Sequence, residues 1–237
     1  EGGDLPAFVD STTLVIGVSY SGKTHETVSA FAAAGQQGAK LIGISTGGEI
    51  GALCRKYRAP FFSIQYGAHA RAALGYLVIP AVAILNRLAI LDIERMQEVI
   101  HTLVSALNIV HDTLRPQVPT HQNRDKQLAE QLTGKLPMIV GSGYSWPVIR
   151  RWQTQFQQNS QAFAVAETVS RMLQSTIQGL SVPGNLPQQL QVVSIRSHFD
   201  TQADAEHLNV LGTVLKRQRF LVADVVLSAA ADPLTEF

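Results

Sequence analysis

Short apolar, β-branched runs alternate with segments of helical periodicity through the first quarter of the chain. The runs at 12–18, 40–45 and 60–64 predict buried strands, and the segments at 26–36 and 50–57 predict the helices between them. A helix after each strand is typical of a parallel sheet covered by helices on both faces. The sequence therefore predicts an α/β fold in this region.

Two longer helices follow in the prediction. The first opens at 67–76 and continues to about residue 87, and the second covers about 93–113 with Asp92 as its N-cap. Two prolines and many polar residues at 115–124 are typical of a linker between domains. We therefore expect a domain boundary in this segment.

The order of strand, turn and helix returns after this linker. Strands are expected at 136–141, 191–195 and 220–226, and helices at 126–132, about 146–177 and 204–216. The repeat predicts two related α/β subdomains, each a parallel sheet flanked by helices in three layers. The expected boundaries are 1–114 for the first subdomain, 115–123 for the linker and 124–237 for a second subdomain that is incomplete at its C-terminus.

Composition narrows the class of protein. The chain has 237 residues, of which 46% are apolar and 16% charged, and these fractions indicate a globular protein. A net charge of +1 gives no electrostatic case for nucleic acid or an anionic membrane. The single Cys54 excludes an intrachain disulfide, and it is expected to be a buried apolar residue. Because Pro80, Asn86 and Arg87 interrupt the apolar run 72–91, we expect a soluble, cytoplasmic protein without a membrane span.

The polar turn after the first strand carries the clearest chemical signal. Residues 19–24 place hydroxyls, a glycine and a lysine directly before a helix. The first amide groups of a helix have no intrahelical partner, and its dipole favours negative charge. The turn therefore predicts a phosphate site, which we call the cradle (residues 19–24). Its candidate phosphate contacts are Ser19, Ser21, Lys23 and Thr24.

The cradle fits two signatures. Residues 17–24, GVSYSGKT, match the P-loop pattern G-x-x-x-x-G-K-S/T. The stretch also resembles the S-Y-S-G-N-T loop of sugar isomerase (SIS) domains, with Lys23 in place of the asparagine. A P-loop protein also needs a strand that ends in an acidic residue to hold magnesium. The candidate at 88–92 continues the preceding helical pattern, and the candidate at 221–224 lies in the other subdomain. A P-loop nucleotide-binding protein is therefore the less favoured alternative.

Further segments resemble the bifunctional phosphoglucose/phosphomannose isomerases of the SIS superfamily. They are STGG at 45–48, RAALGY at 71–76, GSGY at 141–144 and RWQTQFQQNSQ at 151–161. The resemblance covers nearly the whole chain and implies two SIS subdomains, a phosphorylated hexose as ligand, a homodimer, and no metal or organic cofactor. It also implies that Arg71, Thr46 and Gly47 join the cradle in binding substrate.

The resemblance further assigns two proton-transfer positions, and both hold glutamine here. The family's base, a glutamate, falls on Gln158, and its ring-opening histidine falls on Gln174 in an ungapped alignment. An amide has no usable proton equilibrium near neutral pH. We therefore expect interconversion of glucose 6-phosphate or mannose 6-phosphate with fructose 6-phosphate to be impaired or lost. A non-catalytic sugar-phosphate sensor or regulatory partner is the alternative.

Three other residues are weighed as replacement acid or base groups. His25 and His69 lie near the proposed site, since they neighbour the cradle and Arg71 respectively in sequence, but histidines in loops and at helix starts are more often simply exposed. Glu167 is the one carboxylate of the expected 146–177 helix, nine residues from Gln158. The family's first strand–helix turn and its C-terminal lysine-bearing helix have no counterpart here, so a fragment or a short gene product is expected.

Overall fold

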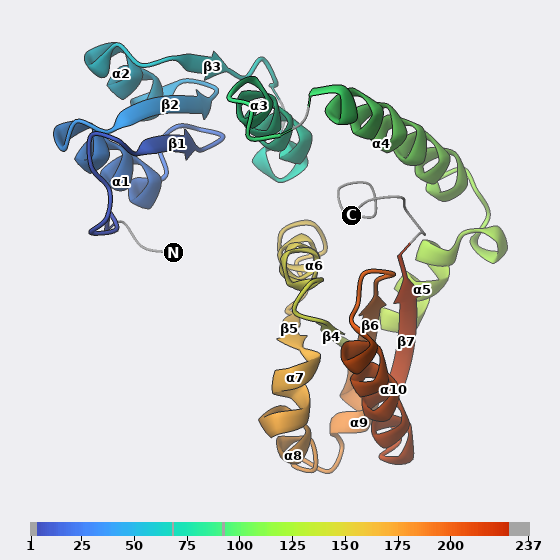
Figure 1. Cartoon of the computed structure of the whole chain (residues 1–237). Helices are drawn as coiled ribbons and strands as arrows, with labels where there is room; N and C mark the ends of the chain where they lie inside the picture. Colours follow the sequence, from blue (N-terminus) through green and yellow to red (C-terminus); the bar gives the residue numbers. More distant parts are fainter. Residues whose placement is uncertain (1–3, 68, 92, 228–237) are drawn as a thin grey trace. The chain divides into compact units, whose positions relative to one another are not determined.

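The computed structural model describes residues 4–67, 69–91 and 93–227 (Figure 1). Contacts within the chain divide it into two compact units, one up to Met96 and one from Gln97 onward. The predicted N-cap Asp92 lies outside the described residues.

The first unit contains a parallel sheet in the order β1-β2-β3. Its strands are β1 (Leu14–Val18), β2 (Lys40–Ser45) and β3 (Phe61–Ser63), and its crossover helices are α1 (His25–Gln36) and α2 (Gly48–Tyr57). The buried core between sheet and helices includes Phe31, Leu41, Ile50 and Cys54. The predicted strand–helix alternation is confirmed, and so is the burial of the single cysteine.

A short 3-10 turn, Ala70–Ala72, and helix α3 (Leu74–Arg87) follow β3. The predicted helix therefore starts at Leu74, and the residues before it form a separate turn. The arrowheads of β1, β2 and β3 point toward α3, so α3 lies beyond the carboxyl edge of this sheet (Figure 1). Helix α4 (Ile93–Leu114) comes next and contains the boundary between the two units.

The second unit holds a parallel sheet in the order β5-β4-β6-β7. Its strands are β4 (Leu136–Gly141), β5 (Val165–Thr168), β6 (Leu190–Arg196) and β7 (Leu221–Val226). Its helices are α5 (Arg124–Leu132), α6 (Trp146–Asn159), α7 (Val169–Arg171), a π-helical turn (Met172–Thr176), α8 (Ile177–Gly179), α9 (Leu186–Gln189) and α10 (Gln202–Arg217). Helices cover both faces of the sheet, because Ile149 of α6 and Leu208 of α10 belong to separate buried clusters.

The residues expected to form a linker are tied to α5 by hydrogen bonds. Thr120–Gln122 form a 3-10 turn, and the side chain of Asn123 caps α5 through the amides of Asp125 and Lys126. The same Asn123 donates to the carbonyl of Leu114 at 2.9 Å. This segment is therefore an ordered connection within the second unit, and the subdomain boundaries at 114 and 124 stay predictions.

One predicted element is wrong. The expected helix at 146–177 ends at Asn159, because Gln161 has a φ of 52° and turns the chain out of the helix. The chain then forms β5, whose Val165 pairs with Met138 of β4. The segments before and after residues 165–168 are rich in alanine, glutamine, leucine and methionine, which favour helix. The four-residue strand between them therefore gives no clear sequence signal, and its pairing with β4 stabilises it. Glu167 consequently lies in a strand, not on a helix.

The fold class is confirmed as α/β, with parallel sheets flanked by helices. Among the described helices, none combines the length and apolar character needed to cross a membrane. The described residues also contain no group of three or more His, Cys, Asp or Glu side chains placed to hold a metal ion.

Candidate functional site

The cradle is a compact turn closed by its own hydrogen bonds. Ser19 Oγ and Thr24 Oγ1 lie 2.9 Å apart, and the Gly22 amide donates to the Ser19 carbonyl at 3.1 Å. The Lys23 amide donates to Ser21 Oγ at 3.2 Å. The three hydroxyls predicted to contact phosphate therefore come from one folded turn, where each still has lone pairs or a rotatable hydrogen to offer.

The amino end of α1 is open at this turn. Thr24 is the N-cap residue, but its side chain makes no capping hydrogen bond, and the helix begins with the Val28 amide donating to the Thr24 carbonyl. A 12-residue helix with an uncapped amino end presents oriented N–H groups and the positive end of its dipole. This arrangement is suited to an anion such as a phosphate group.

The turns after β1 and β2 pack directly against each other. The amide and the hydroxyl of Thr46 both donate to the Tyr20 carbonyl, at 2.8 and 2.9 Å, and the Ile50 amide donates to the Gly22 carbonyl at 3.1 Å. Gly22 has a φ of 65°, and a β-carbon on it would lie 2.1 Å from the Gly47 carbonyl oxygen. The two turns thus form one surface, and only glycine fits at their point of contact.

Exposure differs among the cradle residues. Ser19 is only 5% exposed and lies on the buried side of the turn, whereas Ser21, Lys23 and Thr24 are exposed to solvent. The Lys23 ammonium and the Glu26 carboxylate in the first turn of α1 are both exposed and of opposite sign. Attraction for an anion at this turn therefore depends on backbone amides and hydroxyls as much as on net charge.

Three tyrosines connect the cradle to the segment that contains Arg71. The Tyr20 hydroxyl donates to the Tyr66 carbonyl at 2.7 Å, and the two ring centroids are 6.4 Å apart. The Tyr66 ring stacks on that of Tyr76, with centroids 4.4 Å apart. None of these three tyrosines is among the predicted site residues, although Tyr20 and Tyr76 belong to two of the matched motifs. Tyr66 has no motif that would have revealed it.

The geometry around residues 17–24 bears on the P-loop alternative. Gly17 is part of β1 and pairs with Gly43 of β2, so the loop consists only of residues 19–24. Lys23 lies in this loop, two positions before the first residue of α1. Residues 88–90 are not a strand, because they follow the C-terminus of α3 and Ala89 has a φ of 57°. Asp224 belongs to β7 of the second unit's sheet.

The two residues predicted to occupy the family's proton-transfer positions lie in the second unit and are exposed. Gln158 is in the last turn of α6, and Gln174 is in the π-helical turn after β5. Helix α6 starts at the carboxyl end of β4 and runs back for 14 residues, about 21 Å, so Gln158 lies toward the amino edge of the sheet.

Glu167 lies near the carboxyl end of β5, level with Val140 of β4. Its carboxylate accepts from the Thr168 amide at 3.1 Å and the Thr176 hydroxyl at 3.4 Å, and it lies 3.7 Å from Nε of Arg171. Gln158 lies toward the opposite edge of the same sheet. Glu167 therefore cannot replace a base at the position of Gln158 within the same unit.

The histidines considered as replacement groups are both exposed in the first unit. His25 is the first residue of α1, directly after the cradle, and His69 precedes the 3-10 turn that contains Arg71. The cradle, Arg71 and both histidines thus belong to the same unit, and Gln158, Gln174 and Glu167 to the other.

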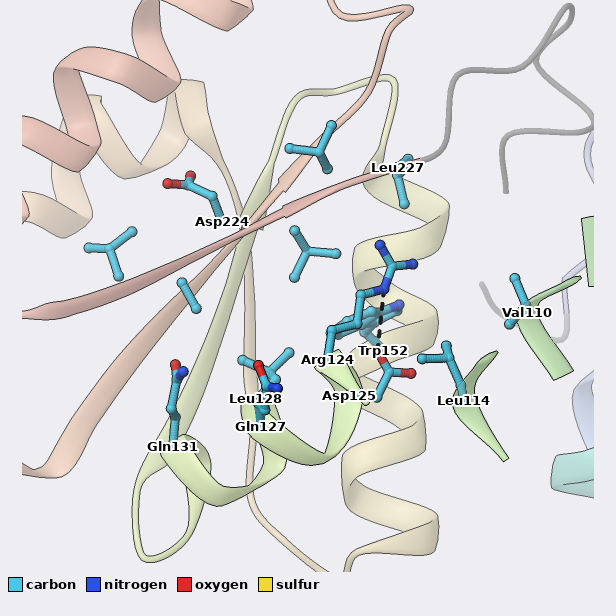
Figure 2. A pocket seen from close by; sticks show the side chains of 14 residues that line it. Val110, Leu114, Arg124, Asp125, Gln127, Leu128, Gln131, Trp152, Asp224 and Leu227 are labelled. Atoms are coloured by element: carbon cyan, nitrogen blue, oxygen red, sulfur yellow. Dashed lines mark ion pairs between the residues drawn. The ribbon is translucent and has the colours of Figure 1, made fainter. Parts of the chain in front are cut away.

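A cavity of about 750 Å³ lies in the second unit, along β7 and beside α5 (Figure 2). Arg124 and Asp125 form an ion pair of 3.9 Å at its wall, and Trp152 of α6 and Leu114 of α4 add apolar surface. Asp224 on its wall is considered only for the P-loop alternative, and none of the residues that line the cavity is a candidate sugar-phosphate contact. The residues that line it include no histidine, cysteine, serine or threonine and no phosphate-binding turn.

Comparison with solved structures identifies the class of fold. A proposed phosphosugar isomerase from Clostridium difficile 630 gives a TM-score of 0.69 at 13% identity, over 97% of this chain and 66% of that chain. The tagatose-6-phosphate ketose/aldose isomerase from Escherichia coli gives 0.55 at 12% identity, over 96% and 60%. The fold is therefore that of SIS phosphosugar isomerases.

Sequence comparisons narrow this class. Residues 121–235 match the family described as the bacterial phospho-glucose isomerase C-terminal SIS domain. The bifunctional phosphoglucose/phosphomannose isomerase of Caldicellulosiruptor bescii is 34% identical over 213 residues, and that of Thermoplasma acidophilum is 30% identical over 168 residues. The chain is a SIS-domain protein related to the bifunctional phosphoglucose/phosphomannose isomerases, as its motifs predict.

The matches cover more of this chain than of its relatives. They span 90% and 71% of this chain, but 62% of the Caldicellulosiruptor protein and 49% of the Thermoplasma protein. A D-glucosamine-6-phosphate 4-epimerase from Sulfolobus acidocaldarius also matches, with 28% identity over 64% of this chain and 46% of the relative.

Proposed function

We propose that the chain binds phosphorylated hexoses of the glucose 6-phosphate, mannose 6-phosphate and fructose 6-phosphate type. The observation that carries this proposal is the cradle, a hydroxyl-rich turn that leads into the uncapped amino end of α1 and interlocks with the turn at 45–48. Relatives named as phosphoglucose/phosphomannose isomerases support this substrate class. The epimerase relative is also named for a hexosamine 6-phosphate, which shares the phosphate group.

In this proposal the cradle holds the phosphate and Arg71 adds a positive charge from the next segment. Ser21, Lys23 and Thr24 are exposed and donate to phosphate oxygens, and Ser19 orients the Thr24 hydroxyl. Thr46 and Gly47 act mainly by fixing the shape of the turn, because their polar hydrogens are already bonded to Tyr20 and Ser45. No metal ion or organic cofactor takes part.

Isomerisation itself is impaired in this proposal. Moving a proton between C1 and C2 requires a base, and opening the sugar ring requires an acid or base. Gln158 and Gln174 are predicted to occupy the positions that the family uses, and an amide cannot act as a general acid or base at neutral pH. The loss of one such group typically costs about 10²–10⁴-fold in rate. A sugar-phosphate sensor or regulatory partner is the second candidate, and the same two glutamines favour it.

Two measurements test this function. Fructose 6-phosphate should raise the melting temperature of the chain, with a shift that grows with the logarithm of its concentration once this exceeds the Kd, whereas fructose should not. Proton NMR of fructose 6-phosphate in D₂O should then show no deuterium at the exchangeable carbon above the level without protein. Binding with exchange would mean that another base is present, and absence of binding would contradict the proposed function. A homodimer and a cytoplasmic location are proposed on the same family grounds, and light scattering tests the first.

A further inference from the structure

The three tyrosines that link the cradle to the segment around Arg71 have no role in the function proposed so far: Tyr20 meets the Tyr66 ring edge-on, and the Tyr66 ring stacks on that of Tyr76. Tyr20 is inside the cradle, Tyr66 follows β3, and Tyr76 is in the first turn of α3. The Tyr20 hydroxyl donates to the Tyr66 carbonyl at 2.7 Å. The stacked rings of Tyr66 and Tyr76 then join the chain on the two sides of Arg71.

This arrangement fixes the segment that contains Arg71 at both ends. Tyr66 lies five positions before Arg71 and Tyr76 five positions after it, and their rings stack with an interplanar angle of 21°. Nearby, Ala73 is fully buried, and the Ile64 amide donates to the Ser45 carbonyl at 2.9 Å. The backbone on both sides of the exposed Arg71 is therefore held against the cradle and against the end of β2.

A role in core packing does not account for the stack. Tyr76 is 49% exposed, so little of the apolar surface of its ring is removed from water. The Tyr20 hydroxyl is used to join two loops at the carboxyl edge of the sheet, where ligands of parallel α/β proteins bind. Ordering a long, flexible arginine before the ligand arrives lowers the entropic cost of binding.

We propose that Tyr20 is a positioning residue, which acts through Tyr66 and Tyr76 to hold Arg71 toward a phosphosugar bound in the cradle. The proposal rests on the proposed function. It adds that the Tyr20 hydroxyl affects affinity only through Arg71, since this hydroxyl donates to the protein backbone and not to the ligand.

A double-mutant cycle tests this coupling. The Kd for fructose 6-phosphate is measured by calorimetry for the wild type, Tyr20→Phe, Arg71→Ala and the double variant. We expect Tyr20→Phe to weaken binding by about 3- to 10-fold, the usual effect of losing one hydrogen bond. In the Arg71→Ala background the Tyr20→Phe change should not weaken binding further. The effects of substitutions at independent sites add, whereas those at coupled sites do not.

Two more comparisons separate positioning from general destabilisation. Tyr66→Leu should weaken binding, and Tyr66→Phe should restore it, because phenylalanine keeps the stacked ring and the backbone acceptor. Tyr57→Phe removes a hydroxyl at the end of α2, away from the three tyrosines, and should bind like the wild type. Hydrogen exchange of residues 70–76 should be faster in Tyr20→Phe, while β1 and β2 remain protected.

The outcomes distinguish this proposal from the proposed function. If the wild type binds fructose 6-phosphate and the Tyr20→Phe and Arg71→Ala effects simply add, the positioning role is wrong and the binding function stands. An unchanged Kd in Tyr20→Phe has the same meaning. If the wild type binds no phosphosugar, the proposed function is wrong and the positioning role is wrong with it.

Discussion

The hydroxyl oxygens of Ser19 and Thr24 lie 2.9 Å apart, at the two ends of the turn between β1 and α1. This contact directs the Thr24 side chain away from the amides of α1, which leaves the helix without a side-chain cap. The missing cap lowers the stability of the helix by about 1 kcal/mol. An anion bound at the amino end of α1 would offset this loss, because it accepts hydrogen bonds from the same amides. The contact thus joins the local geometry to the proposed binding of phosphate.

The first prediction concerns these two hydroxyls. Thr24→Val should weaken fructose 6-phosphate binding by about tenfold or more, because a hydrogen bond to a charged group is lost. Ser19→Ala should weaken it less, since Ser19 is buried and acts by orienting Thr24. Calorimetric titration measures both. Thr213→Val, which removes a hydroxyl bonded to the Asn209 carbonyl in α10, is the matched control, and equal Kd values in all variants would contradict the cradle assignment.

The second prediction concerns the contact between the two turns. Gly22→Ala should lower the melting temperature and abolish phosphosugar binding, because φ is 65° and the added carbon would lie 2.1 Å from the Gly47 oxygen. A left-handed conformation costs a non-glycine residue about 1–2 kcal/mol, before the clash is counted. Thermal unfolding and calorimetry measure the two effects. Gly212→Ala in α10 meets no atom within 4 Å and should be neutral or stabilising, so equal behaviour of the two variants would count against this account.

The third prediction concerns the proton-transfer positions. Combining Gln158→Glu with Gln174→His should raise deuterium incorporation into fructose 6-phosphate by about 10² or more over the wild type, as expected when a general base and acid are supplied. Proton NMR in D₂O measures the rate. Gln157→Glu places a carboxylate one residue away on the same exposed turn of α6 and should give no gain. A folded double variant that binds the sugar but shows no exchange would mean that these positions do not carry the chemistry in this chain.

The fourth prediction concerns Cys54, which is 1% exposed beside Gly43 in the first core. Burial raises the pKa of this thiol, and the Gly43 backbone and Arg55 oppose the shift in part. We expect reaction with a disulfide reagent at pH 8 to be at least about 100-fold slower in the native than in the unfolded chain. Because it is the only cysteine, the absorbance signal reports on this site alone.

The same thiol gives a dependence of stability on pH. A pKa that is higher in the folded chain means that the neutral thiol is the stable form there. The stabilisation that the buried neutral thiol gives the folded chain is therefore complete below the pKa of an unfolded cysteine, about 8.5, and it is lost as the pH rises through the pKa of the folded chain. The stability difference between wild type and Cys54→Ala should shrink above about pH 9. A constant difference from pH 7 to 10 would contradict the raised pKa.

The sequence predicted the regular elements well where strands and helices are strongly patterned. The runs at 12–18 and 40–45 became β1 and β2, and the polar residues between strand and helix became the cradle turn. The prediction failed at β5, where four residues between helix-favouring segments acquire strand geometry only by pairing with β4. A short strand of this kind is specified by its neighbour in the sheet and not by its own residues.

The sequence by itself determined the strand–turn–helix order and the hydroxyls and glycines of the cradle, and it predicted that Gln158 and Gln174 replace the two proton-transfer residues of the family. These are local properties, since dihedral preference, helix dipole and side-chain chemistry belong to the residues themselves. Only the tertiary structure decided that the turns at 19–24 and 45–48 interlock, and that Tyr20 donates to Tyr66, 46 positions away. Such contacts depend on the parallel pairing of β1, β2 and β3, which brings distant turns to one edge of the sheet.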